Sequence, residues 1–114
     1  MDKTMTIVGG NDFYSIASRI EDVIDWAKEK GILDYATAAR QAEKTVEEAQ
    51  ELESAVLVED KEEIKDGIGD TLVTLIIQAE MQGLTLLECL EHAYNQIKDR
   101  QGEMINGTFV KEGD

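Results

Sequence analysis

The chain of 114 residues contains no proline, so nothing in it breaks a long helix. Apolar residues recur three and four positions apart, while the alternation typical of a strand is nearly absent. Glycines such as Gly31 and Gly83 fall where helices of this pattern would end. The pattern predicts four helices, at about residues 11–30, 35–58, 61–82 and 85–101.

Capping residues mark the ends of these predicted helices. Asp34 and Asp60 are placed to cap the second and third helices, and Thr85 with Glu88 forms a capping box for the fourth, which Gly102 closes. Further on, Asn106-Gly107 is a turn signal between two short apolar runs. We therefore expect one all-α domain over residues 1–114, a four-helix bundle-like protomer with a short C-terminal tail or hairpin.

The third predicted helix carries more apolar surface than one core contact needs. Residues 72–77 read Leu-Val-Thr-Leu-Ile-Ile, which is apolar on nearly every side, whereas a surface helix needs a single apolar stripe. In so small a protein this pattern indicates burial against another subunit. We expect a homodimer or homotetramer that assembles through its helices.

Charge and composition exclude several classes of protein. The net charge of -14 comes from 25 acidic and 11 basic residues and argues against a nucleic-acid-binding protein, which needs a basic face. Cys89 is the only cysteine, so no intrachain disulfide exists and a reducing compartment is expected. No apolar run has the length of a membrane span. These features predict a cytoplasmic protein that binds neither nucleic acid nor membrane.

Acidic residues gather on two consecutive predicted helices. Glu48 and Glu51 lie one turn apart on the second helix, and a face of the third carries three more acids: Glu63, Asp66 and Asp70. A carboxylate at the edge of a core, such as Asp70, loses hydration unless a positive charge meets it. Mg²⁺ prefers carboxylate oxygens and fits this arrangement, with Mn²⁺ as a substitute. Gly67 and Gly69 indicate a close approach of backbone or ligand beside Asp70.

The acidic pattern also has a plainer interpretation. About one residue in five is acidic, so an isolated Glu-x-x-Glu pair usually means only a solvated helix face. Cations that could hold phosphate oxygens are few, namely Lys44, Lys98 and Arg100, and basic residues near a helix end also offset the helix dipole. Gln41, Asn95 and Trp26 are candidates for contacts with a base.

The two acidic segments carry a resemblance to a known family. The run Glu47-Glu48-x-x-Glu51-Leu52, followed by Ile68-Gly69-Asp70-Thr71-Leu72, resembles the MazG-like branch of the all-α NTP pyrophosphatases. That superfamily has a Glu-x-x-Glu pair and, on the next helix, a Glu-x-x-Asp pair. The resemblance implies Mg²⁺-dependent hydrolysis of nucleoside triphosphates to monophosphate and pyrophosphate, in a helical oligomer with sites near subunit interfaces. It also suggests removal of non-standard nucleotides.

The motif transfers to this chain with one departure. Glu48 and Glu51 match the first pair, and Asp70 matches the terminal aspartate. The acid expected three residues before Asp70 is Gly67 here, so either Asp66 or Glu63 takes its place as a metal ligand.

The resemblance also suggests roles in the chemistry. Either Glu47 or Glu48 accepts the proton of the attacking water. Charge on the leaving pyrophosphate would be stabilised by one of the basic candidates, Lys44, Lys98 or Arg100.

Two rival interpretations remain open. An acidic binding module, such as a DNA-mimic inhibitor, suits the net charge and predicts no hydrolysis. A purely structural helical oligomer predicts that Asp70→Asn is neutral or stabilising, since an unpaired carboxylate near a core is a burden.

Overall fold

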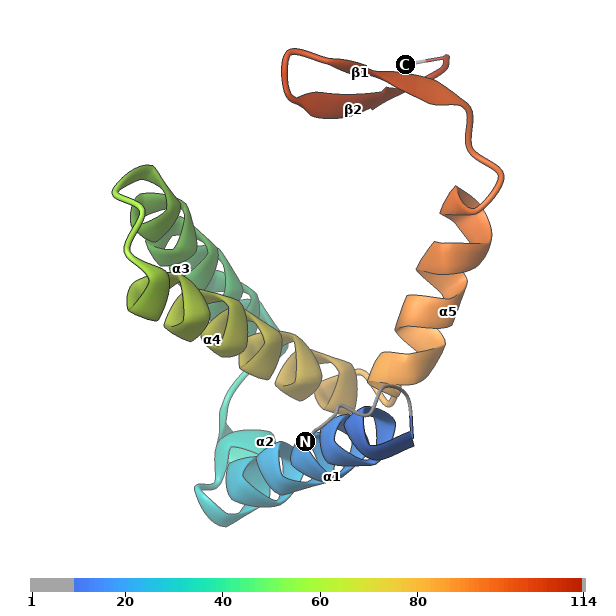
Figure 1. Ribbon diagram of the computed structural model, residues 1–114. Helices are drawn as coiled ribbons and strands as arrows, with labels where there is room; N and C mark the ends of the chain where they lie inside the picture. The colour runs from blue at the N-terminus through green and yellow to red at the C-terminus, as the bar shows by residue number, and fades with distance from the viewer. Residues whose placement is uncertain (1–9, 114) are drawn as a thin grey trace. The chain divides into compact units, whose positions relative to one another are not determined.

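The computed structural model describes the backbone of residues 10–113 and the side chains of residues 15–113. Its elements form two compact units, and the boundary between them along the chain falls between Leu84 and Thr85 (Figure 1). The first unit contains α1 (Gly10–Glu29), α2 (Ile32–Tyr35), α3 (Ala38–Leu57) and α4 (Lys61–Met81). The second contains α5 (Leu86–Ile97), β1 (Gly102–Ile105) and β2 (Thr108–Lys111). The predominantly helical fold confirms the predicted class.

The start of the second long helix differs from the prediction. Gly31 adopts a left-handed φ of 79° and turns the chain into the separate short helix α2, which contains Asp34. The backbone then extends, and Thr37 caps α3 by accepting a hydrogen bond of 3.2 Å from the Arg40 N–H. The predicted cap at Asp34 was therefore wrong, because a second capping site three residues later follows the extended backbone.

The caps of the next two helices are as predicted. Asp60 accepts a hydrogen bond of 3.2 Å from the Glu63 N–H at the start of α4. The capping box of α5 is complete: the Thr85 hydroxyl accepts from the Glu88 N–H at 3.1 Å, and the Glu88 carboxylate accepts from the Thr85 N–H at 2.7 Å.

The predicted C-terminal hairpin is confirmed, but the helix before it ends earlier than expected. Ile105 pairs with Thr108 across a two-residue turn, in which Asn106 and Gly107 have φ values of 50° and 84°. Gly102 begins β1 and does not close the preceding helix, which ends at Ile97. A Cβ on Gly102 would collide with the Phe109 ring and the Val110 carbonyl, so the pairing of β1 with β2 requires a glycine at this position.

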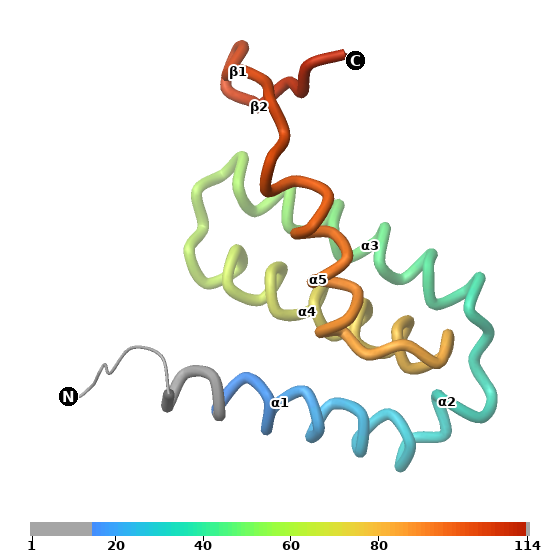
Figure 2. Tube along the Cα trace, turned by 90° about the vertical axis from the view of Figure 1, so that its right-hand side faces the viewer, coloured from blue at the N-terminus to red at the C-terminus, as the bar shows by residue number. Residues whose placement is uncertain are grey.

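The core of the first unit lies around α4. Figure 2 shows α3 and α4 side by side along most of their length, and α4 also contacts α1 and α2. The buried apolar side chains are small or medium in size: Ala27, Ala55, Ile76, Ile77 and Ala79. Contacts with three helices account for much of the apolar surface of α4. Three of its side chains still stay exposed, Ile68 at 57%, Leu72 at 41% and Leu75 at 42%.

No single helix among the described residues has the length and apolar character to cross a membrane. Only α4 and α5 taken together pass that test of length and composition.

Candidate functional site

Helices α3 and α4 meet along a polar seam. The Gln41 amide donates a hydrogen bond of 3.3 Å to the Thr74 carbonyl, and the Thr45 hydroxyl donates one of 2.9 Å to the Thr74 hydroxyl. Near the end of the seam, the Gln78 amide donates to the Ala38 carbonyl at 3.0 Å. The α3 side of this seam advances by alternate steps of three and four, the spacing of a coiled coil: Ala38, Gln41, Thr45, Glu48, Leu52 and Ala55.

Gly67 forms the tightest contact of the α3–α4 seam. A Cβ on this residue would lie 3.0 Å from both the Cα and the Cβ of Leu52, and 3.2 Å from its Cδ1. The close backbone approach expected at this glycine is therefore present. Gly69 is different, because a Cβ there would meet nothing within 4 Å among the described residues.

Glu48 lies on the seam between two of these contacts. Thr45, almost one turn before it, bonds Thr74, and Leu52, one turn after it, packs on Gly67. Because the two helices run antiparallel, Glu48 falls opposite the part of α4 that holds Asp70 and Thr71.

The environment of Glu48 disfavours its ionised form. Burial, followed by repulsion from Glu51 and Asp70, raises the pKa of the Glu48 carboxyl above its ordinary value. Glu47 adds to this repulsion, while Lys44 acts in the opposite direction. Negative charge therefore exceeds positive charge at this point of the seam.

We use the name carboxylate cluster for Glu47, Glu48, Glu51 and Asp70. Three of its members are exposed, and Glu48 is half-buried. The nearest cation is Lys44, whose Nζ lies 3.5 Å from Oε1 of Glu47 in an exposed ion pair. The structure thus brings together five of the predicted site residues from α3 and α4.

Asp66 and Glu63, the two candidates for the missing motif acid, are both exposed on α4. Asp66 lies about one turn from Asp70, whereas Glu63 lies two turns away in the first turn of the helix. Neither contributes to the pKa shift of Glu48.

The donor chemistry of the carboxylate cluster fits a hard cation. Its members offer only carboxylate oxygens, and their mutual repulsion is relieved when a divalent ion lies between them. In the part of the chain that the structure describes, no three acidic, histidine or cysteine side chains converge tightly enough to hold an ion as they stand. Binding would therefore draw the exposed Glu51 and Asp70 side chains toward Glu48, and the metal remains a prediction.

The predicted substrate contacts are more dispersed. Gln41 is only 7% exposed, and its amide is used to hold α3 against α4. Trp26 lies on α1 with 46% of its surface exposed, which leaves its indole available for stacking. The other three candidates are exposed residues of the second unit: Asn95 in α5, and Lys98 and Arg100 just beyond it.

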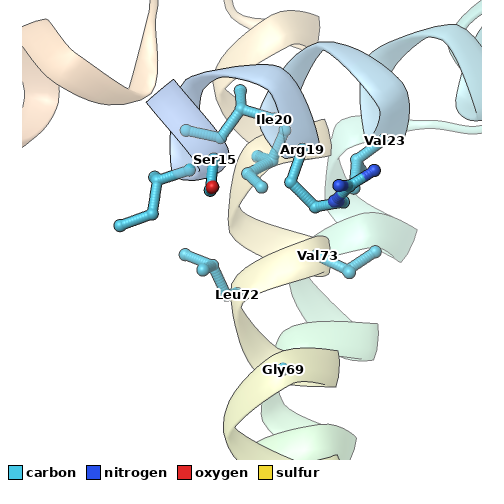
Figure 3. Close-up of a pocket in the computed structure, with 9 residues that line it drawn as sticks. Ser15, Arg19, Ile20, Val23, Gly69, Leu72 and Val73 are labelled. Carbon is cyan, nitrogen blue, oxygen red and sulfur yellow. The ribbon is translucent and has the colours of Figure 1, made fainter. Parts of the chain in front are cut away.

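Sequence reasoning missed an apolar groove between α1 and α4. It has a volume of about 440 Å³, and Figure 3 shows side chains of α1 on the side of Leu72 and Val73 of α4, with Gly69 farther along that helix. Among the described residues that line it, Ser15 and Arg19 are the polar ones, and Arg19 forms an ion pair with Asp22. The helical spacing of Ile16, Ile20 and Val23 was the available signal.

Comparison with known families identifies a matching family model. The family model described as the MazG nucleotide pyrophosphohydrolase domain matches residues 36–105, which is more than half of the chain. The matched range contains all of α3 and α4, and therefore the whole carboxylate cluster. No curated protein and no solved structure matches the chain.

Proposed function

This chain belongs to the MazG nucleotide pyrophosphohydrolase domain family, and from that premise we propose that it hydrolyses nucleoside triphosphates to the monophosphate and pyrophosphate with the help of Mg²⁺. The observation that carries the proposal is the position of Glu48. This acid lies on a helix seam opposite Asp70 and is repelled by Asp70 and Glu51, an arrangement that favours a divalent cation.

The residues that would hold the ion are Glu48, Glu51 and Asp70, with Asp66 or Glu63 as a further ligand. When bound, Mg²⁺ supplies positive charge to the triphosphate and makes the attacking water more acidic. Glu47 is exposed and does not lie on the α3–α4 seam, so its carboxylate is suited to accept the proton of that water. Lys44 lies beside it and would stabilise charge on the leaving pyrophosphate.

We further propose that the protein works as a homodimer or homotetramer. Ile68, Leu72 and Leu75 lie one turn apart on α4 and form a continuous apolar stripe. Exposure of 41% or more at each of the three supports contact with a second copy of the chain.

The decisive experiment separates pyrophosphate from phosphate as the product. Pure protein is incubated with Mg²⁺ and a panel of normal and modified ribo- and deoxynucleoside triphosphates, and again with EDTA. We expect monophosphate and pyrophosphate from at least one nucleotide, only with the metal. Asp70→Asn and Glu51→Gln should each lower the rate at least about tenfold, because each removes a metal ligand.

A matched control is Glu53→Gln, which removes an exposed acid from another face of α3 and should leave the rate unchanged. If folded protein releases no pyrophosphate from any nucleotide, the proposal is wrong. That result would favour an acidic binding module without catalysis.

A further inference from the structure

We propose that Gly67 is a positioning residue for the carboxylate cluster: by having no side chain, it lets α3 approach α4 closely enough for Glu48 and Asp70 to act on one ion. This inference rests on the proposed function, since it concerns the same metal site. It assigns a purpose to the one position at which the chain departs from the family motif.

The contact at Gly67 has little room to adjust. Two of the three Leu52 atoms that a Cβ would meet, at 3.0 Å, are the Cα and the Cβ, which move only with the backbone of α3. A third atom, Cδ1, lies at 3.2 Å and belongs to a side chain that is itself half-buried. Even a single Cβ at this position therefore requires Leu52, and with it the backbone of α3, to move by a few tenths of an ångström.

The displaced segment carries the metal ligands. Leu52 follows Glu51 directly and lies one turn after Glu48, while Asp70 lies one turn after Gly67 on α4. On the other side of Glu48, the Thr45–Thr74 hydrogen bond of 2.9 Å holds the two helices together. Separation at Gly67 would thus tilt α3 about that bond and carry both glutamates away from Asp70.

The same geometry argues that Gly67 does not mark a lost ligand. Gly67 is buried, and a side chain there would point at Leu52 within the α3–α4 seam. A glycine in a helix interior is less favourable than an alanine, but at this position the contact with Leu52 leaves little room for a Cβ. On this backbone, the motif acid would have to enter the seam itself.

Gly69 provides a matched control on the same helix. It lies two residues from Gly67 and directly before Asp70, but a Cβ there meets nothing within 4 Å in the part of the chain that the structure describes. Replacing either glycine by alanine makes the same chemical change, and only one of the two changes touches α3.

The experiment compares wild type, Gly67→Ala, Gly67→Glu and Gly69→Ala. Mn²⁺ binding without nucleotide is measured by electron paramagnetic resonance, and Mg²⁺ affinity by its competition with Mn²⁺. Circular dichroism with EDTA identifies a temperature at which each variant is folded. The Mg²⁺ concentration for half-maximal pyrophosphate release at saturating nucleotide is a second reading.

Both Gly67 variants should weaken Mg²⁺ binding by about tenfold or more, while Gly69→Ala matches wild type. The outcome for Gly67→Glu is the sharpest, because it restores the motif acid and yet should lower affinity. Unchanged affinity in Gly67→Ala, or a gain in Gly67→Glu, would overturn the inference and leave the proposed function intact. No metal binding in wild type and Gly69→Ala would overturn the proposed function and this inference together.

Discussion

Glu48 occupies a position that a two-helix seam usually gives to an apolar side chain. Its neighbours along α3 at this spacing are Thr45 and Leu52, which both contact α4. The carboxyl is therefore partly removed from water while Glu51 and Asp70 repel it. The fold therefore holds an acid where its ionised form is disfavoured, and perturbed acids of this kind are common at functional sites.

This charge predicts an effect of Glu48→Gln on the metal-free protein. Since the pKa of Glu48 is raised in the folded state, the ionised carboxylate lowers the free energy of unfolding at neutral pH. That loss is recovered as the pH falls through the raised pKa toward 4.5, the ordinary value. Glu48→Gln should therefore raise the melting temperature in EDTA at pH 7.5, and the gain should shrink at pH 5.

Differential scanning calorimetry at the two pH values measures this difference, with Glu53→Gln as the control for a general loss of negative charge. An equal gain from both variants would show that net charge, and not the position of Glu48, sets the effect. Adding Mg²⁺ at pH 7.5 should stabilise wild type more than Glu48→Gln, because ligand binding to the folded state raises stability.

The spacing of acids along the chain, together with the family resemblance, singled out Glu48, Glu51 and Asp70, which the structure brings near one another. The sequence did not reveal the structural role of Gln41, because its amide could equally have contacted a substrate. The partner of that amide depends on the register between α3 and α4, and the Thr74 carbonyl is revealed only when the helices are docked. The hydroxyl pair of Thr45 and Thr74 escaped prediction for the same reason.

At the scale of elements, α3 and α4 end in the same way but with different residues. In α3, the Asp60 N–H bonds the Ala55 carbonyl at 3.2 Å, and Glu59 takes a left-handed φ of 56°. In α4, the Leu84 N–H bonds the Ala79 carbonyl at 2.9 Å, and Gly83 has a φ of 73°. Both ends are Schellman motifs, in which glycine is the favoured left-handed residue.

Glu59→Gly should raise the free energy of unfolding by about 1 kcal/mol, because glycine adopts the left-handed conformation without steric cost. Gly83→Ala should lower it by a similar amount, about 1 kcal/mol. Urea denaturation followed by circular dichroism gives both values. The two effects must have opposite signs, and a destabilised Glu59→Gly would contradict the assignment of this turn.

The long helices were predictable because their apolar period runs over many turns. The ends of the helices were harder to predict where two neighbouring residues could each have ended or capped a helix. Asp34 and Thr37 are both good capping residues, but the backbone is extended at Thr37, so Thr37 is the residue that caps α3. Gly102 could have ended a helix or begun a strand, and in the structure it begins β1 because it pairs with Lys111.

At the scale of the whole molecule, the stripe of Ile68, Leu72 and Leu75 is exposed, and it is the surface at which we propose that a second copy binds. We expect wild type to elute as a dimer or tetramer, and Leu75→Glu to shift it toward the monomer, because a buried charge without a partner opposes association. Size-exclusion chromatography with light scattering reports the mass.

Leu57→Glu is the matched control for this change. Leu57 is also an exposed leucine, at 78%, but it ends α3 and lies off the stripe. It should leave the assembly unchanged. A monomeric wild-type protein, or equal dissociation in both variants, would rule out the stripe as the interface.

The contact between Gly67 and Leu52 also bears on how this chain could have evolved. Since a Cβ at position 67 would lie 3.0 Å from the Cα and Cβ of Leu52, a substitution at either position affects the other. A side chain at position 67 would be easier to accommodate after changes at Leu52 or at the Thr45–Thr74 pair that let the two helices separate. Among relatives, a glycine at 67 and a large residue at 52 should therefore be inherited together, as one coupled trait.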